Sequence, residues 1–483
     1  ALEKQKEYYR IAGELEEAQG LNRKLTAQLN KDFQNSSIPS SQQGAGRKKI
    51  PNSREKTDRK QGGQPGHAGH TIKPLAPTES HMLDTPEEYL NNPDYFDTGK
   101  TIKKQKIILV MDAKVIEYKA KIFENRKTGE QVHAEFPDGY VNPVNLDSSV
   151  KGCAFLLANE CNVSAGKVRT FLSEISNGKI VISEATINGL VREFAGKTVP
   201  ELQNIDEELM ASPVMNVDFT TANVNGEMKQ VLIAASPSKH VVHFYARDHK
   251  GHKGIAGSVI ENYVGKLVHD HDVTFYNYGL KHQECMQHNC RYAIGSKQNE
   301  PERSWSRYMH FLFQKMLHYR NSLGENEDFD PRMVAKFERL YDKILLRAKK
   351  EYEDVPPTKY YMEGFNLYRR LEEYKKSELL FLHDKSVPPN NSLAERLAHV
   401  FKRKQKQAIV LRSEWNFKAL CDSLSVIQSL RSEDGDFFQR ICGIFSRLRP
   451  KKPRGKKDAM DGKNKEPAPA ANPTENSTEA DVV

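Results

Sequence analysis

The sequence predicts a multidomain α+β protein with a mixed α/β sheet near its centre. Apolar residues recur at helical spacing over residues 1–31 and again over residues 300–386. Short runs of apolar and β-branched residues, bounded by turn signals, predict strands within residues 211–299. The chain has 483 residues, which is enough for several domains.

Changes in composition divide the chain into eight predicted segments. They are a coiled-coil dimerisation helix (1–31), a flexible basic linker (32–77), a small β-rich module (78–146), a helical candidate DNA-binding region (147–210), the first part of an α/β core (211–299), a helical insertion (300–386), the second part of the core (387–446) and a disordered tail (447–483). An insertion that interrupts an α/β core implies that residues far apart in sequence meet in one site.

Charge and cysteine content restrict the function classes. The formal net charge is +9, with Lys and Arg gathered in runs, and this favours a polyanionic partner such as nucleic acid. Six scattered cysteines do not form a disulfide framework, so we expect the reducing cytoplasm. No apolar run reaches membrane-spanning length, which argues against a membrane partner.

The N-terminal segment predicts a coiled coil. Its seam positions alternate in steps of three and four: Tyr8, Ile11, Leu15, Ala18, Asn22, Leu25 and Leu29. A buried Asn at an a position fixes register and strand number, so we expect a homodimer. The alternative is one amphipathic helix packed on its own chain.

The next three segments carry weaker signals. Residues 32–77 are rich in Ser, Gly, Gln and Pro, and this basic arm either binds DNA phosphates or serves only as a linker. Residues 78–146 combine β-branched runs with a turn at 127–129. Ser183 is the expected N-cap of a helix that belongs either to a DNA-binding element or to the packing. The DNA-contact candidates in the arm are Lys48, Lys49, Arg59 and Lys60.

Residues 211–299 predict the core sheet. Three strands are expected in succession, with a hairpin turn at Asn225-Gly226. A helix over 251–263 and a fourth strand follow, and the right-handed crossover makes the fourth strand parallel to the first. The four strand sequences are PVMNVDFTTANV, KQVLIAASP, HVVHFYARD and KLVHDHD.

Two acids are expected at neighbouring strand ends. Asp218 ends the first strand and Asp270 ends the fourth, so their carboxylates would meet in one crevice. With a third acid they could hold two Mg²⁺ or Mn²⁺ ions for phosphodiester chemistry. Asp272 is the alternative second ligand, and each Asp taken alone is also an ordinary strand-end residue.

The third acid is Glu395, which stands alone in a basic segment. It is either a metal ligand, after the helical insertion, or the N3 partner of Ser392 in a capping box. The basic neighbours suit phosphate contacts beside a cut, with a solvated helix face as the alternative. They are Arg396, Lys402, Arg403, Lys404, Lys406 and Arg412.

Histidines and cysteines follow the second acid. Four of them are predicted to share one helix, and an alternative interpretation is a zinc cluster, although no CxxC pair is present: His282, Cys285, His288 and Cys290. We favour a supporting or DNA-contacting role for Cys285 and His288, with core packing as the alternative. His269 and His271 flank Asp270 and are either supporting groups or plain strand residues.

These segments resemble one family, the transposases of insertion sequence family sixty-six, which are bacterial DDE enzymes with an RNase H-like catalytic domain. The stretches that carry the resemblance are NSSIPSSQ, RKQGGQPGHAGH, MNVDFTTANVNG, KLVHDHDVTFYNYGLKHQECMQHNCRY and PPNNSLAERLAHVFKRKQKQAIVLRS. The resemblance implies an RNase H-like core and makes Asp218, Asp270 and Glu395 the catalytic metal ligands. It also implies supporting roles for Asn391, Cys285 and His288.

The implied function is cleavage and joining of DNA at the element's inverted repeats, in a bacterial, nucleoid-associated cytoplasmic protein that also uses accessory proteins of the element. The sequence differs from the family pattern in two places that bear on this function. Many members carry a cysteine zinc module, but residues 78–150 contain no cysteine, so we expect a zinc-less module. The usual Asp-Glu-Thr reads Asp218-Phe219-Thr220. An inactive DNA-binding derivative and another RNase H-like nuclease are the alternatives.

Overall fold

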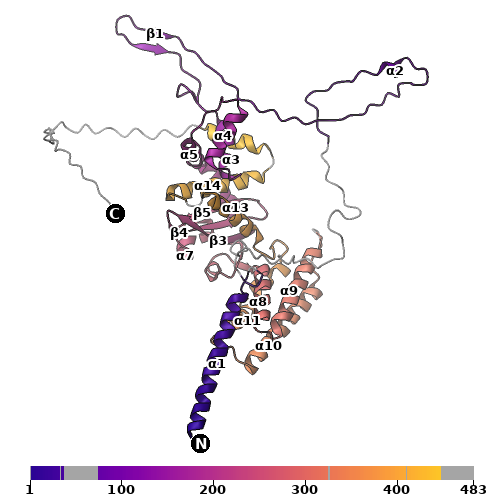
Figure 1. Cartoon of the computed structure of the whole chain (residues 1–483), viewed down its shortest axis with the longest axis vertical. Coiled ribbons are helices and arrows are strands. Elements are labelled where there is room, and N and C mark those ends of the chain that lie inside the picture. The colour runs from indigo at the N-terminus through magenta and orange to yellow at the C-terminus, as the bar shows by residue number, and fades with distance from the viewer. Residues whose placement is uncertain are drawn as a thin grey trace, which may run out of the picture. The chain divides into compact units, whose positions relative to one another are not determined.

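The computed structural model describes residues 2–32, 34–36, 74–324, 327–408, 411–433 and 435–447 (Figure 1). All of them belong to one of the chain's two units, Ala1–Arg447. Most of the predicted basic arm, with Lys48, Lys49, Arg59 and Lys60, lies outside the described residues, as does the predicted tail beyond Arg447.

A five-stranded mixed sheet forms the centre of the described chain, in the order β5-β4-β3-β6-β7. The first three strands are antiparallel neighbours, and β6 and β7 run parallel to β3. The arrangement confirms the predicted hairpins and the predicted parallel fourth strand. The strands are β3 (Val214–Val224), β4 (Glu227–Ala235), β5 (Val242–Arg247), β6 (Lys266–His269) and β7 (Lys281–Glu284).

Local sequence explains the turns of this sheet. Asn225 and Gly226 have φ of 51° and 87°, the left-handed geometry that a tight two-residue hairpin requires. The helix predicted over 251–263 is shorter than expected: α7 (His252–Ile255) ends before Gly257, whose φ is +69°, and a 3₁₀ turn, η2 (Val259–Asn262), follows. A left-handed glycine interrupts the helical hydrogen-bond ladder, so the segment splits.

Helices cover the sheet and its outer edge. α13 (Ser392–Ala408) packs on β3 and β4, and α14 (Glu414–Arg431) lies along β5. The α14 hydroxyls of Ser425 and Ser429 accept hydrogen bonds of 2.8 and 3.0 Å from the backbone N–H groups of Phe244 and Val242. These hydroxyls satisfy edge groups of β5 that would otherwise be open to pairing with another chain.

Residues 147–210 are helical, as predicted, and pack on the same hydrophobic core as the sheet. Ser183 caps its helix by accepting a 3.0 Å hydrogen bond from Thr186 N–H, which confirms the predicted cap. The last described helix closes this part by packing on α3. The helices are α3 (Ser148–Asn159), α4 (Ala165–Ile175), α5 (Glu184–Ala195), α6 (Val199–Met210) and α15 (Phe437–Ser446).

The predicted insertion is helical and has its own core. Trp305, Tyr341 and Phe381 are fully buried in it, and Val214 and Val268 of the sheet join the same cluster. The insertion therefore packs against the β3–β6 end of the sheet. Its helices are α9 (Trp305–Ser322), α10 (Pro331–Asp354), α11 (Glu363–Glu373) and α12 (Lys375–Leu379), with a 3₁₀ turn η4 (Leu380–Leu382). The helix α8 (Met286–Asn299) precedes the predicted insertion and packs on α9.

The segment predicted to be β-rich has less strand than expected. It holds a short helix, α2 (Glu87–Leu90), and one hairpin of β1 (Ile122–Glu124) and β2 (Gln131–His133). The predicted turn is present, since Gly129 N–H donates 2.8 Å to the Asn125 carbonyl. The apolar run 107–111 stays exposed and pairs with no strand among the described residues, because β-branched residues form strands only where a partner is available.

The N-terminal helix α1 (Leu2–Asn30) confirms the predicted helix, and none of its residues is buried. Its C-terminal end is held by the insertion, through a 2.5 Å ion pair between Arg23 and Glu302. Asn35 adds a 2.6 Å hydrogen bond to Gln298. The seam residues remain exposed, so pairing into a coiled coil stays a prediction. Among the described helices, none has the length and apolar content needed to cross a membrane.

Candidate active site

The sheet brings two of the predicted acids level with each other. In the parallel pairing of β3 with β6, Asn216 lies opposite Val268, so two residues further on Asp218 comes level with Asp270. Asp270 directly follows β6, as predicted. Asp218 lies within β3 rather than at its end, because β3 continues to Val224 by pairing with β4.

Glu395 reaches the same place from the first turn of α13. Its Oε1 lies 3.5 Å from His288 Nδ1 and 4.0 Å from Arg291 Nη2. The capping-box interpretation is not supported: the N–H of Ser392 bonds to Asn390 Oδ1 at 3.2 Å, not to Glu395. Glu395 contributes its own N–H to the helix start, by donating to the Asn391 carbonyl.

Four side chains form a compact cluster: the possible ligand atoms of Asp270, Cys285, His288 and Glu395 all lie within 4.8 Å of one another. His288 Nδ1 is 3.0 Å from Asp270 Oδ1. Three of these atoms, Asp270 Oδ1, His288 Nδ1 and Glu395 Oε1, are buried without an aligned hydrogen-bond partner among the described residues. Carboxylate oxygens are the ligands that a hard divalent cation prefers, and those of Asp270 and Glu395 hold no aligned hydrogen bond, so the acids fit such an ion.

The acids perturb one another electrostatically. Burial, followed by the negative charge of Asp270, raises the pKa of Asp218 to about 8. The Phe219 N–H, which donates 2.7 Å to Asp218 Oδ1, works in the opposite direction. Burial alone would lower the pKa of His288, but its contacts with Asp270 and Cys285 raise that pKa well above the usual value. The site therefore brings three carboxyl groups together with two cationic groups, the His288 imidazole and the Arg291 guanidinium.

Asn391 and Cys285 connect the three elements of the site. The Asn391 side chain donates 2.9 Å to the Val217 carbonyl and accepts 3.0 Å from Asn216 Nδ2, both on β3. Its N–H donates 3.3 Å to Cys285 Sγ, between β7 and α8. These contacts fix the start of α13 against the strand that carries Asp218.

The other histidines point to different partners. His269 is buried, and its Nε2 lies 3.2 Å from His282 Nδ1. His271 contacts Glu284 Oε1 at 2.5 Å, where the Tyr276 hydroxyl also donates. The zinc cluster considered from the sequence is not found among the described residues, because the group of possible metal ligands there includes Cys285 and His288 but neither His282 nor Cys290. His282 lies on β7, while Cys285 precedes α8. The four residues therefore do not share one helix as predicted.

Glu284 and Arg370 were missed from the sequence. Burial would raise the pKa of Glu284, but His271 and Arg370 outweigh it and hold that pKa down, at about 2. Arg370 on α11 lies 3.6 Å from Glu284 and so ties the insertion to the loop after Asp270. The only local signal for Glu284 was its position as an acid at the end of a short polar strand. Such acids are common, so this signal is not specific.

Asp272, the alternative second ligand, has a structural partner. Its Oδ1 accepts 3.0 Å from Thr274 N–H and caps the 3₁₀ turn η3 (Val273–Asn277). It is not among the four clustered ligand residues. The geometry therefore favours Asp270 over Asp272.

The basic residues of α13 separate into two groups. Lys402 donates to the Thr221 hydroxyl at 2.8 Å, and Lys404 donates 2.6 Å to the Ala158 carbonyl. Burial lowers the pKa of Lys404 to about 8. These two lysines connect α13 to the core, so their contacts favour a packing role over the predicted role as phosphate contacts. The exposed group, at helical spacing on one face, is Arg396, His399, Arg403 and Lys406, and Arg412 beyond the helix is also exposed.

Comparison with known proteins identifies the family of this chain. No curated protein matches the chain. The family model described as Transposase IS66 family matches residues 171–419, which is more than half of the chain and includes all three acids. On this match, the chain with converging Asp218, Asp270 and Glu395 belongs to the IS66 family of transposases.

Proposed function

We propose that this protein cuts and joins DNA at the terminal inverted repeats of its insertion sequence. The observation that carries the proposal is that Asp270 and Glu395 lie in one compact cluster and that burial, together with the charges of both, raises the pKa of Asp218 on the neighbouring strand β3. The strand order of the sheet supports an RNase H-like catalytic core around these acids.

The three acids would hold two Mg²⁺ or Mn²⁺ ions. Such ions supply an activated water or 3′-hydroxyl and stabilise the leaving oxygen of the phosphodiester. The chain's own contribution is placement: Asn391 and Cys285 fix the position of Glu395 relative to β3. Arg291, 4.0 Å from Glu395, is placed to bind a phosphate oxygen at the same site.

The exposed face of α13 would bind the DNA backbone beside the cut. Arg396, Arg403 and Lys406 lie on the helix that carries Glu395. A DNA backbone bound to these three side chains would therefore pass close to the acids. A homodimer through α1 would hold two element ends together, and its exposed seam of Tyr8, Ile11 and Leu15 is available for pairing. We place the protein with DNA in the bacterial cytoplasm, together with accessory proteins of the element.

The function is tested with DNA duplexes that carry the inverted repeats flanking the gene. Wild-type protein with Mg²⁺ or Mn²⁺ is expected to nick these ends and to join the freed 3′-hydroxyl to target DNA, and EDTA to stop both. Binding without cutting would support an inactive derivative. Cutting of branched or hybrid substrates without joining would support another RNase H-like nuclease.

Two neighbouring residues on α13 separate DNA contact from folding. Arg403→Ala is expected to weaken DNA binding and to reduce the slope of log affinity against log salt by about one, because one phosphate contact is lost. Lys404→Ala is expected to leave that slope unchanged and to lower the free energy of unfolding by about 1–3 kcal/mol, because the buried Ala158 carbonyl loses its donor. Filter binding over a salt series and urea unfolding measure the two effects. The reverse pattern would contradict the assignment.

A further inference from the structure

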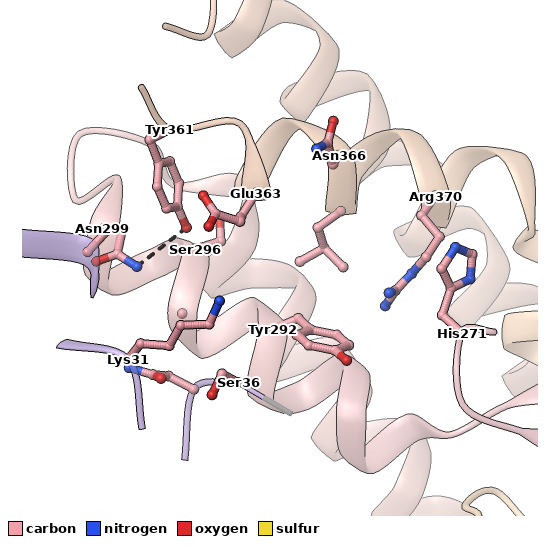
Figure 2. Close-up of a pocket in the computed structure, with 14 residues that line it drawn as sticks. Lys31, Ser36, His271, Tyr292, Ser296, Asn299, Tyr361, Glu363, Asn366 and Arg370 are labelled. Atoms are coloured by element: carbon pink, nitrogen blue, oxygen red, sulfur yellow. Dashed lines mark hydrogen bonds between the residues drawn. The ribbon is translucent and has the colours of Figure 1, made fainter. Parts of the chain in front are cut away.

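A pocket of about 290 Å³ lies beside the acids, between the end of α1, α8 and α11 (Figure 2). Its lining includes Tyr292, Ser296 and Asn299 of α8, with Arg370 of α11. None of these residues has a role in the chemistry proposed above.

The pocket adjoins the catalytic cluster through α8. Tyr292 follows His288 by four residues, which is about one helical turn or 5.4 Å, and their ring centroids are 6.0 Å apart. His271, the residue after Asp270, also lines the pocket. A strand whose phosphate lies at the acids therefore has this pocket within reach of an adjacent nucleotide.

The lining has the chemistry that recognises a nucleotide. Tyr292 offers an aromatic ring whose position is braced by the Arg370 guanidinium, 4.8 Å from the ring centroid. Asn299, whose amide nitrogen also donates to the Tyr361 hydroxyl at 3.4 Å, supplies an amide group for a base edge. Lys31 at the exposed rim supplies a cation for phosphate. Glu363, also exposed, is the only acid among the described residues that line the pocket. Flipped bases are held in this way, by stacking on aromatic rings and hydrogen bonds to their edges.

The walls are fixed without a ligand. Arg370 lies 3.6 Å from buried Glu284 and also donates to Asn289. The opposite wall is formed by the segment after α1, which packs closely on α8. The packing is so close that a Cβ on Gly295 would lie 2.5 Å from the Asn35 carbonyl oxygen. Asn35 itself is held by Gln298 at 2.6 Å. The volume is near the lower limit of ligand pockets, roughly 300 Å³, which suits one nucleotide and is too small for duplex DNA.

We propose that this pocket binds one unpaired nucleotide of the DNA strand adjacent to the cut, with its base stacked on Tyr292. The proposal rests on the proposed function, because it assigns a part of that DNA substrate to the pocket. Extrusion of the base would hold the strand end in register with the acids.

The test is a coupling measurement between protein and DNA. Metal-free affinities are measured for wild type and Tyr292→Ala, on inverted-repeat duplexes with an abasic site scanned through the nucleotides around the cut. Tyr292→Ala is expected to weaken binding of intact DNA about tenfold, because one base stack is lost. At one scanned position the abasic DNA is expected to bind both proteins equally, because the stacked base is already absent.

Three controls separate stacking from folding. Tyr292→Phe keeps the ring and is expected to retain wild-type affinity. Tyr308→Ala removes an exposed tyrosine of α9 outside the pocket and is expected to show no coupling at any position. Excess free nucleoside monophosphate is expected not to displace the DNA, which distinguishes a strand nucleotide from a free one.

The outcomes distinguish this proposal from the proposed function. If wild type cuts the ends but no position couples to Tyr292, or if free nucleotide binds in a Tyr292-dependent way while DNA does not, the pocket proposal is overturned and cleavage stands. If coupling is found but wild type never cuts, the pocket proposal holds and the proposed catalytic function fails.

Discussion

Glu395→Gln is expected to reduce metal-dependent cleavage of the element ends by about a thousandfold or more. The substitution keeps the shape of the side chain but removes one carboxylate from the cluster of Asp270, Cys285 and His288. A metal ligand supports several kcal/mol of transition-state stabilisation, and each 1.36 kcal/mol corresponds to about tenfold in rate. DNA affinity measured without metal is expected to change little, because the exposed basic face of α13 is unaltered. Gel assays of nicking and filter binding measure the two effects.

Asp272→Asn is the matched control for this loss. Its side chain caps a 3₁₀ turn, and Asn caps as well as Asp, so the fold is retained. We expect cleavage close to the wild-type rate in this variant and a loss as large as that of Glu395→Gln in Asp270→Asn. Full activity of Glu395→Gln would show that Glu395 is not a metal ligand. Loss of activity in Asp272→Asn, with Asp270→Asn still active, would show that Asp272 is the second ligand in place of Asp270.

Asp218→Asn is expected to stabilise the metal-free protein at alkaline pH. Burial and the charge of Asp270 raise the pKa of Asp218 to about 8 in the folded protein. An unfolded chain has an Asp pKa of about 3.9. The raised pKa contributes stability that is present below about pH 4 and is lost as pH rises through about 8, because the folded state then carries a buried charge. Asn cannot ionise, so the variant escapes this loss.

Urea unfolding in EDTA from pH 4 to pH 9 measures the difference. The two proteins are expected to have similar free energies of unfolding near pH 4, with the variant ahead by about 2–5 kcal/mol at pH 9, at 1.36 kcal/mol per unit of pKa shift. Asp218 keeps some exposed surface, which favours the lower end of this range.

Two further measurements test whether ionisation of Asp218 causes this difference in stability. Mg²⁺ is expected to stabilise wild type at pH 9 and to leave Asp218→Asn nearly unchanged, because a ligand that binds only the folded protein raises its stability. Asp330→Asn, at an exposed helix cap that bonds Arg332 N–H at 2.8 Å, is expected to show no such crossover with pH. Equal free energies of unfolding for wild type and Asp218→Asn at every pH would contradict the raised pKa of Asp218 in the folded protein.

The sequence by itself determined the elements whose signals are local. The Asn225-Gly226 hairpin and the Ser183 cap follow from neighbouring residues, and the structure contains both. The pairing of the first four strands followed from these signals and from the handedness of one crossover, but the fifth strand, β7, was not predicted. The two aspartates could be named from the predicted strands, whereas the resemblance to the transposase family favoured Glu395 as a metal ligand over the capping-box alternative.

Tertiary structure decided what depends on partners far along the chain. Lys402 and Lys404 were predicted to contact DNA. In the structure their ammonium groups donate hydrogen bonds to the Thr221 hydroxyl and to the Ala158 carbonyl. The short polar strand β7 exists only because β6 lies beside it, and the exposed run 107–111 has no such partner among the described residues.

The same distinction applies within the site. Sequence named the acids, but only the fold placed His288 between Asp270 and Glu395, and closed the pocket beside Tyr292 with Asn35 from the N-terminal segment. The physical reason is range. Backbone periodicity and capping act over a few residues and are visible in any window of sequence, whereas burial, ion pairing and pKa depend on which distant side chains the packed core brings together.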